Sequence, residues 1–112
     1  MNITGAMHKH VYVIHLTGNL SGYAETEQLH TEVKRCLKRM TNNIVIDLKD
    51  VNWMGSVGLG VLICCLTSVR DAGGDLRLMG VKNKVQDLLE ISKLTGIFQI
   101  FSSIEEAVDS FN

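Results

Sequence analysis

The chain lacks a surplus of charge of either sign. Its 11 basic and 12 acidic side chains leave a formal net charge of −1, and they are spread along the sequence. Such a protein has no strong field that would attract nucleic acid or an acidic membrane surface. We therefore expect no nucleic-acid binding, and a partner that is recognised by shape.

Cysteine and long apolar runs are also scarce. Cys36, Cys64 and Cys65 cannot all pair within one chain, and their spacing fits neither a C-x-x-C motif nor a zinc knuckle. No segment approaches the roughly 18 apolar residues of a membrane span, and the N-terminus has no long apolar core behind a basic start. These features predict a reduced, cytoplasmic protein without direct membrane insertion.

The chain does contain enough apolar material for one core. With 112 residues, of which 46% are hydrophobic, it can bury roughly two thirds of its unfolded surface. No internal repeat, linker or low-complexity tract interrupts it. The sequence thus predicts a single domain over residues 1–112.

Strand and helix patterns alternate in the first half of the chain. A β-rich run from Val11, which Gly18-Asn19 is expected to close, predicts a strand, and the stretch around Ile3 is expected to pair with it as an edge strand. A helix follows, with Ser21 as its expected N-cap. Its apolar face is predicted to hold Leu29, Val33, Cys36, Leu37 and Met40. The run I-V-I-D-L from Ile44 to Leu48, apolar except for Asp47, predicts a central, parallel strand.

The second half continues the alternation. A helix with Leu59, Leu62, Ile63, Leu66 and Val69 on its apolar face is expected to stop at Ala72-Gly73-Gly74, before a strand at 76–79. Asn83 is the expected cap of a third helix that carries Val85, Leu88, Leu89 and Ile91 and ends near Thr95-Gly96. A last strand over 98–101 and a capping box from Ser103 to Glu106 precede a terminal helix. The order β-β-α-β-α-β-α-β-α predicts an α/β fold, with a mixed, mostly parallel sheet of about five strands and about four helices.

The stretch W-M-G-S-V-G-L-G, from Trp53 to Gly60, lies where the central strand gives way to the second helix. Folds of this kind place their sites at the carboxyl ends of strands, and we expect the 18–24 loop beside it. A helix that begins near Ser56 would direct free N–H groups at an anion. The stretch nevertheless lacks the Lys-Ser/Thr of a P-loop and the full G-x-G-x-x-G of a dinucleotide fold. Anion binding and ordinary helix capping by Ser56 therefore both remain open.

Catalytic and metal-binding patterns are weak. S-V-G-L-G is not G-x-S-x-G, and no base is placed beside Ser56. The histidines, which are His8, His10, His15 and His30, match no strong metal motif, so structural roles are favoured for them. Cys64-Cys65 is expected to pack in the core, and Trp53 either anchors a partner or packs beneath its loop. We expect no enzyme activity, no metal and no cofactor.

Five segments in succession resemble a known family. They are V-Y-V-I-H-L-T-G-N-L from residue 11, N-I-V-I-D-L-K-D-V from 43, G-L-G-V-L from 58, D-A-G-G-D-L-R-L-M-G-V from 71 and L-T-G-I-F-Q-I-F-S-S-I-E-E-A from 94. Together they resemble the STAS domains, and within them the bacterial anti-sigma factor antagonists. The resemblance implies a β/α domain without catalysis that docks onto an anti-sigma factor with serine kinase activity and frees the sigma factor.

The chain departs from this family at the phosphorylated loop. That loop usually contains Asp-Ser-Ser-Gly or Asp-Ser-Thr-Gly, and the hydroxyl residue before the glycine accepts phosphate. Here Val57 stands in the acceptor position, Gly55 replaces the acid, and Ser21 takes the place of a second common Asp. Either Ser56 is phosphorylated instead, or the domain binds constitutively. We favour constitutive binding, because a displacement by one residue turns a side chain about 100° around the helix axis.

The resemblance and the glycine-rich loop together predict a docking surface. Its residues are Ser21, Gly22, Tyr23, Trp53, Met54, Gly55, Ser56, Val57 and Gly58, beside the exposed face of the second helix. The expected partner is an anti-sigma factor of the serine kinase type. The alternatives are a nucleotide or small anion at the start of the second helix, and a role as a subunit of a transporter-associated complex.

Overall fold

The elements follow one another in the predicted order. The computed structural model describes residues 2–94 and 96–111, without the side chain of Asn83. The strands are β1 (Asn2–His8), β2 (Val11–Leu20), β3 (Asn43–Met54), β4 (Asp75–Met79) and β5 (Ile100–Phe101). The helices are α1 (Tyr23–Lys38), α2 (Ser56–Asp71), α3 (Asn83–Ile91) and α4 (Ile104–Asp109).

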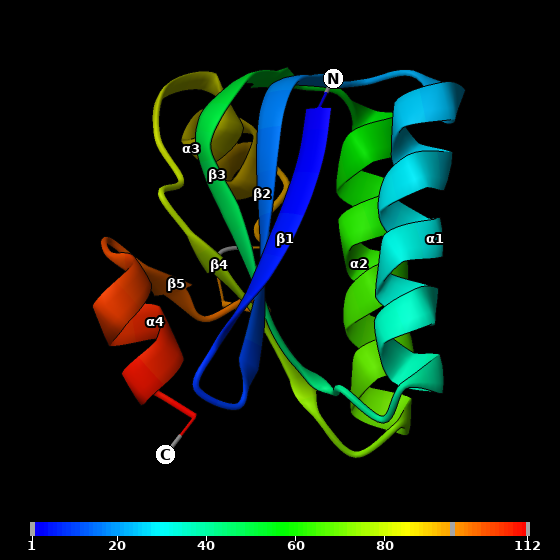
Figure 1. Ribbon diagram of the computed structural model, residues 1–112. Coiled ribbons are helices and arrows are strands. Elements are labelled where there is room, and N and C mark those ends of the chain that lie inside the picture. Colours follow the sequence, from blue (N-terminus) through cyan, green and yellow to red (C-terminus); the bar gives the residue numbers. More distant parts are fainter. Residues whose placement is uncertain (1, 95, 112) are drawn as a thin grey trace.

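The sheet is mixed and mostly parallel. Its order is β1-β2-β3-β4-β5, with β1 antiparallel to β2 and the remaining neighbours parallel. Helices α1 and α2 cover one face, and α4 lies against the other (Figure 1). Strand β3 is central, and Ile44, Ile46 and Leu48 are buried under α1 and α2. The α/β fold, the edge strand near Ile3 and the central parallel strand are therefore confirmed.

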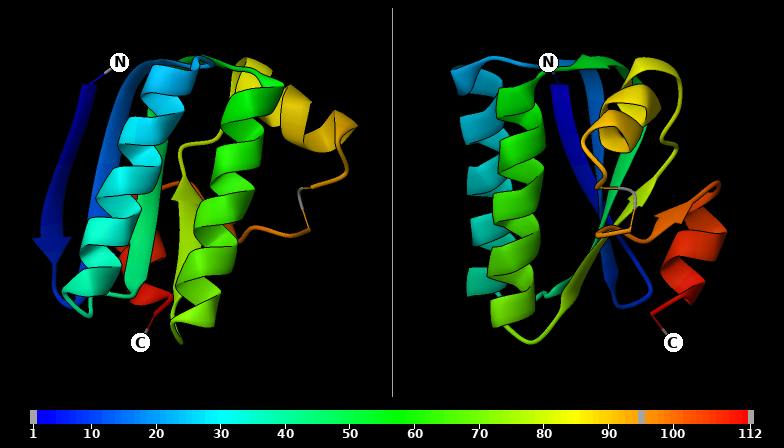
Figure 2. Two further views of the ribbon diagram at one scale, coloured as in Figure 1. Left: turned by 90° about the vertical axis from the view of Figure 1, so that its right-hand side faces the viewer. Right: turned by 180° about the vertical axis from the view of Figure 1, so that it is seen from behind.

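Strand β2 is longer than the sequence predicts. Gly18-Asn19 does not close it, because pairing with β3 continues as far as Leu20 opposite Met54. The β2–β3 register shifts twice, after His15 and after Gly18, and β3 advances by one extra residue at each shift. Such bulges change the face of the sheet to which the following side chains point, and they strengthen the twist of the strand. As a result β2 and β3 end side by side (Figure 2).

Helix α1 begins and ends differently from the prediction. Gly22, not Ser21, is the N-cap, and no side chain caps the helix there. At the other end Met40 lies beyond the helix with φ of 61° and is 89% exposed. The Met40 N–H bonds to the Leu37 carbonyl and the Thr41 N–H to the Cys36 carbonyl. This Schellman arrangement turns the chain before Met40 can reach the core.

The later helices confirm the predicted stop of α2 and the predicted capping box. Gly73 has φ of 88° directly after α2, and the Ser103 hydroxyl accepts the Glu106 N–H at 3.2 Å. Helix α3 begins at Asn83 with Lys82 as N-cap, so Asn83 is not the cap, and the helix ends at Ile91. Its predicted end near Thr95 falls partly outside the described residues. Strand β5 is limited to residues 100–101, shorter than predicted.

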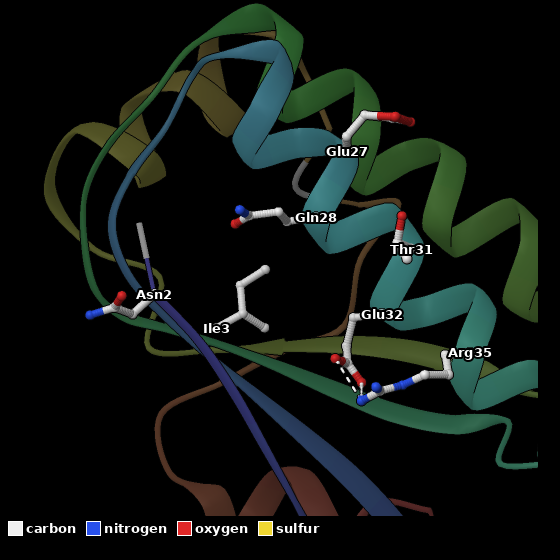
Figure 3. A pocket seen from close by; sticks show the side chains of 7 residues that line it. All are labelled: Asn2, Ile3, Glu27, Gln28, Thr31, Glu32 and Arg35. Carbon is white, nitrogen blue, oxygen red and sulfur yellow. Dashed lines mark hydrogen bonds and ion pairs between the residues drawn. The ribbon is translucent and has the colours of Figure 1, made fainter.

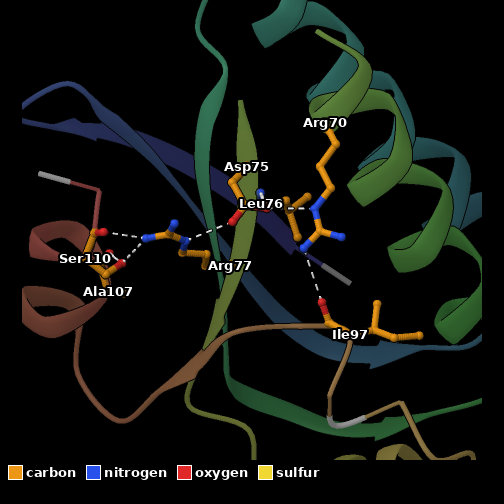
Figure 4. Close-up of polar contacts among 7 residues, drawn as sticks. All are labelled: Arg70, Asp75, Leu76, Arg77, Ile97, Ala107 and Ser110. Carbon is orange, nitrogen blue, oxygen red and sulfur yellow. Dashed lines mark hydrogen bonds and ion pairs between the residues drawn. The ribbon is translucent and has the colours of Figure 1, made fainter. Parts of the chain in front are cut away.

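A polar network attaches the C-terminal end to the sheet (Figure 4). Arg77 on β4 donates to the Ser110 carbonyl at 2.6 Å and, through Nε, to Asp75 at 3.1 Å. The Arg77 guanidinium also lies 4.1 Å from the centre of the Phe111 ring. Asp75 accepts a second bond from Arg70 on α2 at 3.2 Å. One carboxylate thus links α2, β4 and the segment after α4.

Candidate functional site

Two loops meet where β2 and β3 end. The Gly55 N–H donates to the Leu20 carbonyl at 3.2 Å, and a Cβ built on Gly55 would lie 3.8 Å from the Cβ of Ser21. Both loops follow the carboxyl ends of neighbouring parallel strands, where the sequence places the 18–24 loop beside the 53–60 stretch. The two segments of the predicted docking surface therefore lie side by side.

Gly58 is the point of closest approach beneath these loops. A Cβ on Gly58 would lie 2.2 Å from the Leu20 carbonyl oxygen and 3.0 Å from the Cγ atoms of Leu20 and Met54. Only glycine fits there without a backbone shift. Gly58 and Met54 are both buried. The sequence predicts that these two residues contact the partner. They instead support the surface from beneath and are not exposed on it.

Ser56 starts α2 but does not cap it. The N-cap is Gly55, whose carbonyl accepts the Leu59 N–H at 3.0 Å, and no side-chain cap bond is present at this helix start. The helix-cap interpretation of Ser56 is therefore wrong. Ser56 is exposed, and the first turn of α2 contains no acidic residue. Its backbone N–H groups, like those of any helix start, have no partner within the helix.

Apolar side chains project around the meeting loops. Tyr23 is 80% exposed, Trp53 is 44% exposed and Val57 is 36% exposed. The exposed ring of Trp53 also packs back on its own loop, since a Cβ on Gly55 would lie 3.0 Å from it. We call the surface formed by Ser21–Tyr23 and Trp53–Val57 the rim.

Helix α3 adds residues that the predicted surface did not include. An open hollow of about 540 Å³ lies between the rim and α3. Its lining residues are Trp53, Met54, Gly55, Ser56, Lys84, Asp87, Leu88 and Ile91. The charges of Lys84 and Asp87 are opposite, so the hollow has no surplus of either sign.

Ile91 lies on α3, as the sequence predicts, but it does not share the buried side of that helix. Its side chain is 80% exposed, whereas Val85 and Leu89 are buried. Six residues after Val85, a helical position lies about 120° away from it around the axis. The spacing itself therefore carried a signal that Ile91 faces outward.

The predicted roles of histidine and cysteine can be compared with the structure. His15 is half-buried and lies 2.8 Å from the buried Asp47 and 3.1 Å from Asp50. This cluster, brought together by the first register shift, is away from the rim. Within residues 2–94 and 96–111, no group of three or more His, Cys, Asp or Glu is arranged to hold a metal ion.

The two adjacent cysteines of α2 differ in their exposure to solvent. Cys65 is fully buried, as expected, but Cys64 is exposed, so the prediction that both pack in the core is wrong for Cys64. Cys65 shares the buried side of the helix with Leu66, whereas Cys64 lies about 100° from Cys65 in the opposite direction around the axis and points outward. Burial raises the pKa of the Cys65 thiol to about 12.

The whole chain can now be compared with known proteins. The profile of the STAS domain matches residues 3–107. The chain belongs to the STAS domain family. BtrV of Bordetella bronchiseptica, named as a candidate anti-sigma factor antagonist, is 31% identical to this STAS chain over 88 residues, which cover 79% of this chain and 76% of BtrV.

Solved structures confirm the STAS fold. The crystal structure of a candidate anti-sigma factor antagonist from Thermotoga maritima superposes with a TM-score of 0.89 at 24% identity, covering 97% of this chain and 93% of that one. SpoIIAA, a Bacillus cell fate determinant, was solved in its phosphorylated form. It superposes with a TM-score of 0.77 at 19% identity and covers 99% of this chain and all of its own. Among the described residues of this STAS domain, no helix has the length and apolar character to cross a bilayer.

Proposed function

We propose that this STAS domain is an anti-sigma factor antagonist that docks, through its rim, onto an anti-sigma factor of the serine kinase type in the cytoplasm. Binding occupies the anti-sigma factor and frees the sigma factor, and the chain makes or breaks no covalent bond itself. The observation that supports this proposal most directly is the exposure of Tyr23, Trp53 and Val57 beside the two loops that meet at the ends of β2 and β3. Aromatic residues of this kind are common anchors in protein interfaces.

The neutral, apolar character of the rim also predicts how phosphorylation there would affect binding of the partner. A phosphoserine adds nearly two negative charges, which a neutral apolar surface does not compensate. Val57 has no hydroxyl, and its side chain is exposed at the acceptor position of the family's loop. We therefore propose that phosphorylation does not release this antagonist from its partner at that position, so that binding is constitutive.

Binding to the anti-sigma kinase from the same organism tests the docking proposal. We expect Val57→Glu to weaken the affinity at least about tenfold, or roughly 1.4 kcal/mol, because it places a charge in the apolar contact. Met40→Glu is the matched control, since Met40 is an exposed apolar residue at the opposite end of α1. Isothermal titration calorimetry measures both variants. Equal binding by wild type and Val57→Glu, or stable association with transporter components instead, would contradict the proposal.

Incubation with the same kinase and ATP tests constitutive binding. We expect no change in intact mass for the wild type, and a gain of one phosphate for Val57→Ser, which restores a hydroxyl at the acceptor position. The exposed Ser56 is the competing acceptor. A phosphate on the wild type that disappears in Ser56→Ala would show that the hydroxyl one residue earlier carries the switch.

The open hollow beside Ser56 supports one alternative, a small anionic ligand. Lys84 and the start of α2 line this hollow and favour an anion, whereas Asp87, which lines it too, opposes one. A ligand present at 100 times its dissociation constant adds about 2.7 kcal/mol to the stability of the folded state. Thermal unfolding with ATP, GTP and their diphosphates measures this effect, and an unchanged midpoint with all four excludes nucleotide binding at ordinary concentrations.

A further inference from the structure

Strand β1 has one free edge. It pairs with β2 along all seven of its residues, and no strand of the described chain lies on its other side. Figure 2 shows β1 as the outermost strand, beyond the part of the sheet that α1 covers. Alternate N–H and C=O groups of such a strand point outward, where they can pair with another strand.

Nothing in β1 protects this edge. Natural edge strands are commonly blunted by proline, charged side chains, bulges or a covering segment. The residues from 2 to 7 are N-I-T-G-A-M, which contain neither charge nor proline, and their register with β2 is unbroken. All of the strand except the half-buried Ile3 is exposed. The edge therefore has no bulge, is neutral over residues 2–7 and is exposed.

The residues of β1 are complementary to themselves. We propose that β1 pairs antiparallel with β1 of a second copy of this chain, centred on Gly5, so that two sheets join into one. In this register Ile3 lies opposite Met7 of the second copy, on the face that carries α1. Thr4 lies opposite Ala6 of the second copy, on the other face. Whichever alternate residues point outward, the set is symmetric about Gly5.

The charges beside β1 favour the same two-fold arrangement. A groove of about 460 Å³ separates β1 from α1 (Figure 3), and Glu27 lines it towards the end where α1 begins. At the other end of the strand, Arg39 lines a second hollow with Met7, while Arg35 and Glu32 line both hollows. Arg35 is paired with Glu32 at 2.8 Å, and Arg39 lies in the turn after α1. A two-fold axis at Gly5 sets the acidic end of one copy beside the basic end of the other, so the charges attract.

Sedimentation equilibrium of the whole chain tests the proposed dimer. We expect the average mass to rise with concentration from 12.4 kDa towards twice that value. Thr4→Lys with Ala6→Lys places two pairs of like charges opposite one another and should weaken the dimer about tenfold. Thr4→Lys with Ala6→Glu changes the same two exposed positions but creates opposite-charge pairs, and should restore the dimer. Far-ultraviolet circular dichroism and thermal melting establish that both double variants are folded.

The possible outcomes separate clearly. A mass of 12.4 kDa at every concentration up to roughly 1 mM, the weak end of measurable association, overturns the proposal. A dimer that the two lysines leave unchanged overturns it as well, because association then uses another surface. Concentration-dependent protection of the β1 amides against hydrogen exchange would support it. None of these results bears on the rim, which lies at the ends of β2 and β3.

Discussion

Gly58→Ala should destabilise the protein relative to Gly60→Ala, although both substitutions replace a glycine near the start of α2. Alanine is favoured over glycine in a helix by about 1 kcal/mol at either position. This gain is the same in both variants, so it cancels when their free energies of unfolding are compared. The remaining difference in free energy reports how well each site accommodates one added methyl group.

The surroundings of the two glycines set the magnitude. A Cβ at position 58 would lie 2.2 Å from the Leu20 carbonyl oxygen, so α2 and β2 must separate by about 1 Å to reach ordinary contact. At Gly60, no atom of the described residues outside the adjoining backbone of α2 lies within 4 Å of the added atom. Overpacking of this kind costs about 1–3 kcal/mol. We expect Gly60→Ala to stabilise the protein by about 0.5–1 kcal/mol, and Gly58→Ala to fall about 1–3 kcal/mol below it.

Urea denaturation and thermal melting measure both variants. For a domain of this size, 1 kcal/mol corresponds to a shift of about 4 °C in the melting temperature, so the two midpoints should differ by roughly 4–12 °C. The Leu20 carbonyl also accepts the Gly55 N–H, so Gly58→Ala should disturb the rim and weaken partner binding, whereas Gly60→Ala should not. Equal stabilisation by both alanines would refute the argument that the contact with Leu20 requires glycine.

Two further predictions concern groups away from the rim. His15→Ala should destabilise the fold by about 1–3 kcal/mol in urea denaturation, because the buried Asp47 loses its bond to His15 at 2.8 Å and is left with the Lys49 N–H. Asp50→Asn should change stability by less than about 1 kcal/mol, since Asp50 is half exposed. Equal effects of the two substitutions would contradict this prediction. Burial raises the pKa of the Cys65 thiol from 9.0 to about 12, so its contribution to stability should be complete below pH 9 and be lost as the pH rises towards 12. At pH 8 a thiol reagent should modify the exposed Cys64 in the native protein and Cys65 only after unfolding, as peptide mass spectrometry would show.

The sequence by itself determined the order and type of the elements. The apolar run at 44–48 predicts a central strand, Gly73 marks the end of α2, and Ser103 with Glu106 opens α4. These are local signals, because each depends on spacing or on a single backbone conformation within a few residues. The resemblance to the STAS domains, which the profile match confirms, also comes from the sequence.

The tertiary structure decided how those elements meet. Gly18-Asn19 has the local character of a strand end, yet β2 continues past it because β3 lies alongside and supplies hydrogen-bonding partners. The first shift in the β2–β3 register places Asp50 as well as Asp47 beside His15, and this arrangement depends on residues about 30 positions apart. No periodicity within one segment carries that information.

The candidate site also has one part that the sequence predicts and one part that only the tertiary structure shows. Topology alone places the 18–24 loop beside the 53–60 stretch, since both follow neighbouring parallel strands. The part played by α3, with Ile91 outward and Lys84 beside the start of α2, came only from the folded chain. Helical spacing gives the direction of a side chain about its own axis, but which surface stands opposite is set by the packing of separate elements.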